Sequence, residues 1–108
     1  RRQNFEVYSG DSKTIVVQIL DINDQPKDLS NVKSVTWCLR QYESDFFVEK
    51  TLADGLKVSD TDNSVLEIEL TSEDTRGVFG NFFHDLEIED TVGNNITAMS
   101  GRVTINYD

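Results

Sequence analysis

The chain has 108 residues, which fits one domain with a single modest core, so we predict one domain over residues 1–108. With 10 basic and 20 acidic residues its net charge is −10, which argues against binding nucleic acid or anionic membrane surfaces. No apolar run approaches the roughly 20 residues of a transmembrane helix, and the one cysteine excludes an internal disulfide. Because the chain opens on Arg-Arg-Gln, we expect an excised domain or an internal fragment.

The first third of the chain predicts two strands and an acidic loop. Phe5 and Val7 predict a short first strand, and residues 14–22 form the most β-prone run. The apolar residues of that run fall on both faces: Ile15, Val17 and Ile19 on one, Val16, Leu20 and Ile22 on the other. Such a run is typical of a central strand, or of one covered on its second side.

The next two strands alternate more cleanly. Val35, Trp37 and Leu39 share one face, and we expect Trp37 at the centre of the core. Phe46, Val48 and Leu52 then outline the inward face of another strand. Phe47, Glu49 and Thr51 lie on its opposite face. A tight turn at 53–55 leads into a short strand over 56–59.

The stretch from 65 to 94 predicts a strand, one helical turn and a returning strand. Leu66, Ile68 and Leu70 alternate with glutamates, as in a half-buried strand. Thr71 and Asp74 have capping-box spacing, and Gly77 can end the turn in the left-handed conformation, so one short helical turn is expected near 71–77. In the second strand Phe82, His84, Leu86 and Ile88 share the apolar face. Phe83, Asp85, Glu87 and Glu89 share the other.

The last strand is expected over 96–107. Its alternation changes phase near Gly101, where a β-bulge fits. Seven or eight short strands separated by turns predict an all-β fold, an antiparallel sandwich.

The acidic loop over 21–28 is the one candidate metal site. Asp21, Asn23, Asp24 and Asp28 offer the oxygen ligands that calcium prefers, and the string DINDQP resembles the cadherin linker motif. That motif closes a domain in cadherins, whereas here it lies near the start, so an Asx-rich turn is the preferred interpretation. Asp60, Asp62 and Asn63 are weaker candidates of the same kind. We predict no metal and no cofactor.

No set of residues predicts catalysis. His84, the only histidine, falls on an apolar strand face and is expected in the core, and Cys38 is expected to be an inert, sheet-covered thiol. The paired glutamates of the strands are expected to form a solvated or subunit-facing surface. No phosphate-binding glycine loop or serine-hydrolase elbow is found. The protein is therefore predicted not to be an enzyme.

Aromatic residues exceed what one thin core requires. The candidates for a subunit interface are Phe47, Phe83, Phe79 and Tyr42. Phe47 and Phe83 fall on the acidic parity of their strands, where an exposed aromatic marks a contact surface. A covered sheet face is the alternative.

Several pieces in order resemble the small immunoglobulin-like domains of tailed-bacteriophage virion proteins, including the N-terminal domains of upper baseplate proteins. These pieces are Gly10-Asp11 at a strand start, Pro26-Lys27-Asp28-Leu29-Ser30, Trp37-Cys38-Leu39-Arg40, Leu70-Thr71-Ser72-Glu73-Asp74-Thr75, Gly80-Asn81-Phe82-Phe83-His84-Asp85-Leu86, and Asp90, Gly93 and Gly101 in the closing hairpin. The chain departs from the pattern at Gln25, where a glycine is usual, and at Phe82, which replaces a tyrosine.

The resemblance implies an immunoglobulin-like β-sandwich and a non-catalytic structural role in the tail, baseplate, neck or capsid surface. It implies other virion subunits as partners, a homo-oligomer, and a virion location after synthesis in the bacterial host cytoplasm. It transfers no functional residues. Two alternatives are a module that binds host-surface carbohydrate or protein, and a calcium-dependent adhesion domain.

Overall fold

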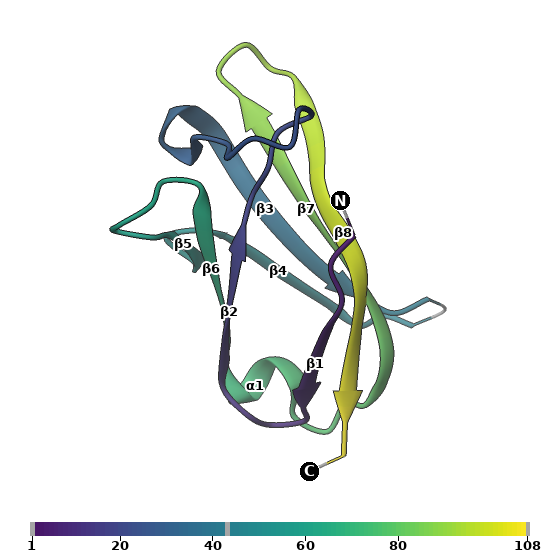
Figure 1. The fold of residues 1–108 in the computed structure, drawn as a ribbon. Helices are drawn as coiled ribbons and strands as arrows, with labels where there is room; N and C mark the ends of the chain where they lie inside the picture. Colours follow the sequence, from purple (N-terminus) through teal and green to yellow (C-terminus); the bar gives the residue numbers. More distant parts are fainter. Residues whose placement is uncertain (1, 43, 108) are drawn as a thin grey trace.

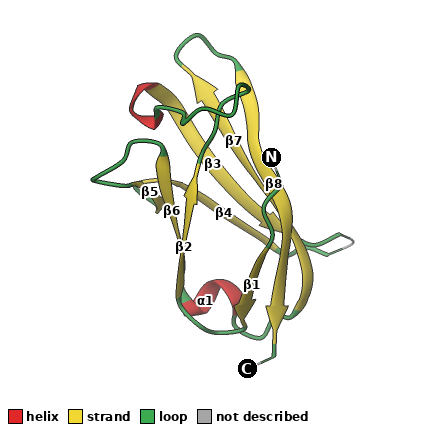
Figure 2. Ribbon diagram, viewed as in Figure 1, coloured by secondary structure: helices red, strands yellow, loops and turns green. Residues whose placement is uncertain are grey.

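The computed structural model describes residues 2–42 and 44–107. Within those residues the chain forms eight strands and two short helical segments (Figures 1 and 2). The strands are β1 (Phe5–Tyr8), β2 (Lys13–Gln18), β3 (Val32–Arg40), β4 (Phe47–Leu52), β5 (Gly55–Val58), β6 (Val65–Leu70), β7 (Gly80–Asp90) and β8 (Asn95–Asn106). The helical segments are the 3-10 turn η1 (Leu29–Asn31) and the one-turn helix α1 (Ser72–Thr75). No helix in the described part of the chain is long and apolar enough to span a membrane.

The strands follow the order β1-β8-β7-β3-β4-β5-β6-β2, which folds over into two layers (Figure 1). The link between the layers is narrow, because β4 and β5 pair only at Thr51–Gly55 and Leu52–Leu56. One layer then contains β2, β6 and β5, and the other contains β1, β8, β7, β3 and β4. This arrangement is sandwich-like and built of strands, so the predicted all-β fold class is confirmed.

Two strand pairs are parallel, in contrast to the fully antiparallel sheet that we predicted. β1 runs parallel to β8, and the short β4–β5 link is also parallel. At the link, Ala53 (φ 67°) and Gly55 (φ 98°) take left-handed conformations. The chain therefore coils through 53–55 and crosses to the second layer without reversing its direction.

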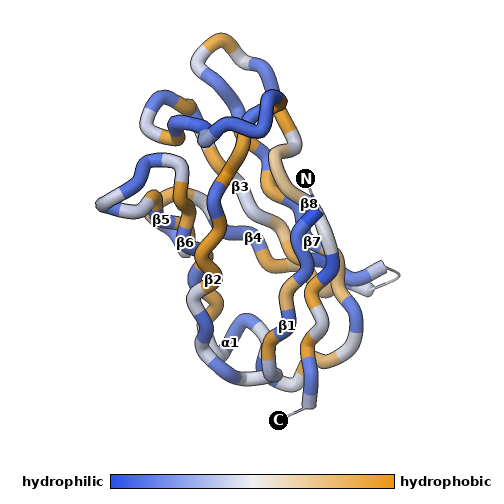
Figure 3. Tube along the Cα trace, viewed as in Figure 1, coloured by the Kyte–Doolittle hydropathy of each residue, from blue (hydrophilic) through white to orange (hydrophobic). Residues whose placement is uncertain are grey.

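The core lies between the layers and follows the alternation of the sequence. Trp37 and Phe82 are its largest fully buried side chains, as expected for Trp37. The other buried hydrophobic residues are Val7, Ile15, Val17, Ile19, Leu29, Val35, Leu39, Leu56, Leu66, Ile68, Leu70, Leu86, Ile88, Met99, Val103 and Ile105. Figure 3 shows hydrophobic and hydrophilic residues alternating along the strands, so each layer has one apolar and one polar face.

The prediction for residues 14–22 is wrong in one respect. β2 pairs only with β6 and stands at the end of the strand order, so it is an edge strand and not a central one. Its second face is not covered, because Val16 is 62% exposed. The strand also ends at Gln18, and Ile22 lies fully in solvent on the following turn.

The corner between β6 and β7 forms as predicted. The Asp74 carboxylate accepts a hydrogen bond from the Thr71 N–H (2.8 Å), and Gly77 takes a left-handed conformation (φ 73°) after the single helical turn. Lys50 of β4 forms an ion pair with Asp74 (2.8 Å). Burial alone would raise the pKa of Asp74, but the bonds from Lys50 and Thr71 hold that pKa below its usual value. The corner is thereby tied to the opposite layer.

The β-bulge of the last strand lies at Ala98 and not near Gly101. Leu86 pairs with Met99 and Glu87 pairs with Thr97, which leaves Ala98 as the extra residue. Gly101 has a different role, because a Cβ there would lie 1.8 Å from the Gln3 carbonyl oxygen. The N-terminal segment thus crosses β8 where the strand has no side chain.

We predict that Gly101→Ala loosens the N-terminal segment. The added methyl group overlaps the Gln3 backbone, so residues 2–8 must shift along β8, at a cost of about 1–3 kcal/mol in the free energy of unfolding. Urea unfolding measures the loss, and Ser100→Ala, an exposed neighbour on the same strand, serves as the control. Equal stability of the two variants would show that the close approach is not maintained in solution.

Candidate interaction face on the outer sheet

The register of four strands places aromatic and arginine side chains in one row. Arg40 of β3 pairs with Phe47 of β4 on one side and with Phe83 of β7 on the other, and Phe83 pairs with Arg102 of β8. Their sequence neighbours Leu39, Phe82 and Val103 point into the core. The four residues therefore lie on the outer face of the β4-β3-β7-β8 layer, and we call them the aromatic–arginine row.

All four aromatic residues predicted as interface candidates lie at this end of the layer. Phe47 is 55% exposed and Tyr42 is 73% exposed. The Tyr42 ring contacts the half-buried Phe83 ring, with centroids 4.6 Å apart. Phe79, just before β7, stacks on Tyr107 with centroids 3.9 Å apart. The first pair thus joins exposed Tyr42 to Phe83 of the row, and the second, exposed pair lies beyond the row.

Sequence reasoning missed the two arginines and Tyr107. The signal for Arg40 was present, because Arg40 has the same parity on its strand as Cys38, which was placed on the polar side. Arg102 was harder to find, since the misplaced bulge left the phase of the last strand uncertain. Their arrangement with the phenylalanines depends on strand register, which the sequence does not display.

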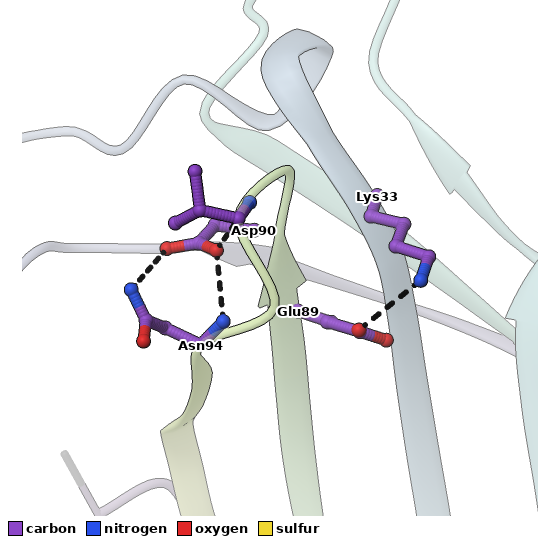
Figure 4. Close-up of polar contacts among 5 residues, drawn as sticks. Lys33, Glu89, Asp90 and Asn94 are labelled. Carbon is purple, nitrogen blue, oxygen red and sulfur yellow. Dashed lines mark hydrogen bonds and ion pairs between the residues drawn. The ribbon is translucent and has the colours of Figure 1, made fainter.

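Beyond the row the same face becomes acidic. The next row across the four strands contains Glu49, Cys38, Asp85 and Ser100. The row after it contains Thr51, Thr36, Glu87 and Thr97. Arg40 forms an ion pair with Asp85 across the first boundary. At the far end Glu89 pairs with Lys33 (3.3 Å), beside a turn closed by Asp90 and Asn94 (Figure 4).

This composition divides the face into two parts with different expected behaviour. Protein interfaces are enriched in Tyr, Phe and Arg, and their centres are depleted of Asp and Glu. The aromatic–arginine row matches that composition, whereas the acidic rows match a solvated surface or the rim of a contact. The outer face is therefore the candidate site, with the row as its centre.

The carboxylates of the acidic loop are used to close turns. One Asp21 oxygen accepts hydrogen bonds from the backbone N–H groups of Asn23 (2.8 Å) and Gln25 (3.0 Å). Asp28 accepts from the Ser30 side chain and from its N–H group, and these bonds lower the pKa of Asp28. Asp24 adopts a positive φ of 59° within the turn. This is the Asx-rich turn that we preferred.

The calcium candidates do not converge into a metal site. Among residues 2–42 and 44–107, no group of three or more Asp, Glu, His or Cys side chains is placed to share an ion. Asp62, from the weaker set, is likewise engaged with Ser64, whose hydroxyl and N–H bonds lower the pKa of Asp62.

His84 is a buried structural histidine, as predicted. The Trp37 indole N–H donates to its Nδ1 (3.1 Å), and its Nε2 lies 2.7 Å from the Gln3 carbonyl oxygen. Because an indole N–H can only donate, Nδ1 must be an acceptor, and the ring is neutral with its proton on Nε2. Burial lowers the pKa of His84 and outweighs the opposing effects of Gln3 and Asp85.

Cys38 is half-buried on the acidic side of β3. Burial raises the pKa of its thiol, and the carboxylates of Asp85 and Glu49 raise it further, with Arg40 opposing them. A protonated thiol is a poor nucleophile. The residue fits the inert role that we expected for it.

An open apolar hollow of about 760 Å³ lies at the opposite end of the layer. Leu20, Ile22, Ile96 and Ala98 form its apolar lining, and Asp21, Asp24, Lys27 and Thr97 also line it. Its walls come from one exposed loop and one strand end. It is separate from the aromatic–arginine row.

No protein-family model matches the chain, and no curated protein matches its sequence. A 2,6-sialyltransferase from Photobacterium shares 8% identity over 98% of this chain, with a TM-score of 0.34. Extracellular domains 3–5 of Drosophila OTK share 12% identity over 97% of this chain, with a TM-score of 0.37. The chain spans only 17% and 32% of those two structures.

We predict that His84 titrates below its ordinary pKa of 6.5. The unfolded chain then binds this proton at a higher pH than the folded chain. The stability linked to His84 is therefore complete above pH ~6.5 and is lost as the pH falls through the folded pKa, by about 1.4 kcal/mol per pKa unit of difference. Since the chain has one histidine, the NMR signals of its imidazole C–H groups report the titration without overlap from other histidines.

Trp37→Phe is the matched variant, because it removes the indole donor to Nδ1 and should move the His84 pKa upward. The carboxyl groups whose pKa is lowered, such as Asp62 and Asp90, affect stability only as the pH falls below their ordinary pKa of 3.8. A wild-type midpoint at or above 6.5 would contradict the lowering of the His84 pKa by burial.

Proposed function

We propose that this domain is a non-enzymatic structural and assembly component of a tailed-bacteriophage or prophage virion, acting in the tail, baseplate or neck through contacts with other subunits. The observation that carries the proposal is the aromatic–arginine row on the outer sheet face. Aromatic and arginine side chains are enriched among the residues that dominate binding energy at protein interfaces, which supports a docking role for the row. The ordered sequence resemblance to virion domains supports the setting.

The chemistry of the titratable groups favours binding over catalysis. His84 is neutral, and both of its nitrogens are engaged in the core. The Cys38 thiol has a raised pKa. Asp21, Asp28 and Asp62 hold turns closed. A catalytic base must instead be within reach of the proton it removes and free to accept it.

A host-surface glycan is a second candidate ligand, favoured by one observation. The stacked Phe79–Tyr107 pair offers an exposed aromatic platform, and the nearby Asn81–Thr104 side-chain hydrogen bond (3.3 Å) brings an amide and a hydroxyl to the same end of β7 and β8. Sugars bind by stacking their apolar faces on such rings. Binding on a glycan array that Tyr107→Ala abolishes would favour this function.

An unchanged melting temperature with added calcium would remove the adhesion alternative.

We predict that Phe47→Ser and Tyr42→Ser each weaken docking on virion partners. Both side chains are more than half exposed, so the loss falls on binding and not on folding, at about 1–3 kcal/mol each. The measurement is mass spectrometry of purified particles from a phage that carries each variant, with copy number determined against the major tail protein.

Val16→Ser is the control, because Val16 is equally exposed but lies on the other layer. The wild-type and control chains should be present in stoichiometric amounts in the particles, and the two variants should be depleted. Absence of the wild-type chain from purified particles would overturn the proposed function.

A further inference from the structure

The order of residues along the aromatic–arginine row is self-complementary. Read across β4, β3, β7 and β8, the row is Phe47, Arg40, Phe83, Arg102. A two-fold axis that runs along the strands midway between β3 and β7 reverses this order in a facing copy. Arg40 then lies opposite Phe83, and Phe47 lies opposite Arg102. Every arginine of the row then faces a position that an aromatic residue occupies, which is the pairing that cation–π contacts use.

The same two-fold rotation also places compatible residues opposite one another in the acidic rows. In the first of them, Glu49 falls opposite Ser100, and Cys38 falls opposite Asp85. In the next row Thr36 falls opposite Glu87 and Thr51 opposite Thr97. No carboxylate in these rows faces another carboxylate. A face with so many acids can therefore approach its own copy without placing like charges directly opposite.

The other way of facing two such sheets lacks this property. A two-fold axis that runs across the strands lays β7 over β7 of the second copy. If that axis crosses β7 at Glu87, the acidic residues Asp85, Glu87 and Glu89 lie against one another. If it crosses the aromatic–arginine row instead, Arg40 and Arg102 each lie opposite their own copies. Like charges in direct opposition are destabilising, so the charges of the face select the axis along the strands.

We infer that a second copy of this chain covers the outer face, with the two-fold axis along the strands between β3 and β7. This inference rests on the proposed function, whose docking face it assigns to a partner of identical sequence. The contact is isologous, since each copy uses the same patch. Facing sheets pack ~10 Å apart with their strands ~30° from alignment, so the axis meets the midline between β3 and β7 at one row only. Residues lie opposite one another most closely at that row.

Phe47 and Arg102 provide the test, because they cannot contact each other within one chain. They lie on β4 and β8, three strand spacings or about 14 Å apart. Phe47→Arg sets two arginines opposite each other across the axis, and Arg102→Glu sets a carboxylate opposite a phenyl ring. The double variant sets Arg opposite Glu. Rescue by the double variant can only come from contact between two copies.

The experiment is sedimentation equilibrium over a concentration series for the wild type, both single variants and the double variant. We expect a wild-type dimer, a dimer dissociation constant raised at least tenfold in each single variant, and recovery to within about threefold of the wild type in the double variant. Lys57→Glu is the matched charge-reversal control, because Lys57 lies on β5 in the other layer. Melting temperatures check that each variant is folded.

Three outcomes would overturn the inference: a strictly monomeric wild type, single variants that dimerise as the wild type does, or a double variant as weak as the singles. A monomer that is still incorporated into particles would leave the virion role standing and assign the face to a different subunit. A rescued dimer that is absent from particles would support the inference and overturn the virion role.

Discussion

The hydrogen bond between Trp37 and His84 fixes the position of β3 against β7, and both faces of the larger layer depend on it. The indole N–H is buried and has one acceptor, the His84 Nδ1 at 3.1 Å. A slip of one residue would turn Trp37 toward solvent and leave His84 without its donor, at the cost of an unsatisfied buried polar group. The other His84 nitrogen bonds to Gln3, so the same ring also holds the N-terminal segment on the sheet.

The register that buries Trp37 also builds the outer face. Because strand side chains alternate, pairing Trp37 with Leu86 on the inside requires Arg40 to pair with Phe83 on the outside. The register that packs the core therefore also fixes the positions of the residues in the aromatic–arginine row. A sandwich layer that is rigid on its core side presents its outer side chains in a fixed order. A fixed order of side chains allows specific binding, in contrast to nonspecific hydrophobic association.

Much of the fold could be predicted from local patterns, and the errors share one cause. Alternation identified the buried faces of β3 and β7, and capping chemistry identified the corner at Thr71 and Asp74. The edge position of β2 and the bulge at Ala98 were missed, because both depend on which strand lies alongside. A glycine in a strand indicates either a bulge or a close backbone approach, and only the crossing of Gln3 decides between them at Gly101.

The candidate site follows the same division. That Phe47 and Phe83 point outward could be predicted from parity within each strand. That Arg40 stands between them, and that Arg102 completes the row, is a property of three separate pairings between strands remote in the sequence. The net charge of −10 then bears on how two copies of the chain can approach each other. General acidity opposes indiscriminate association, and the acidic column of β7 opposes one orientation of a facing copy while the row favours the other. Charge on this domain therefore does more than maintain solubility, because its placement on the outer sheet limits how two copies can meet.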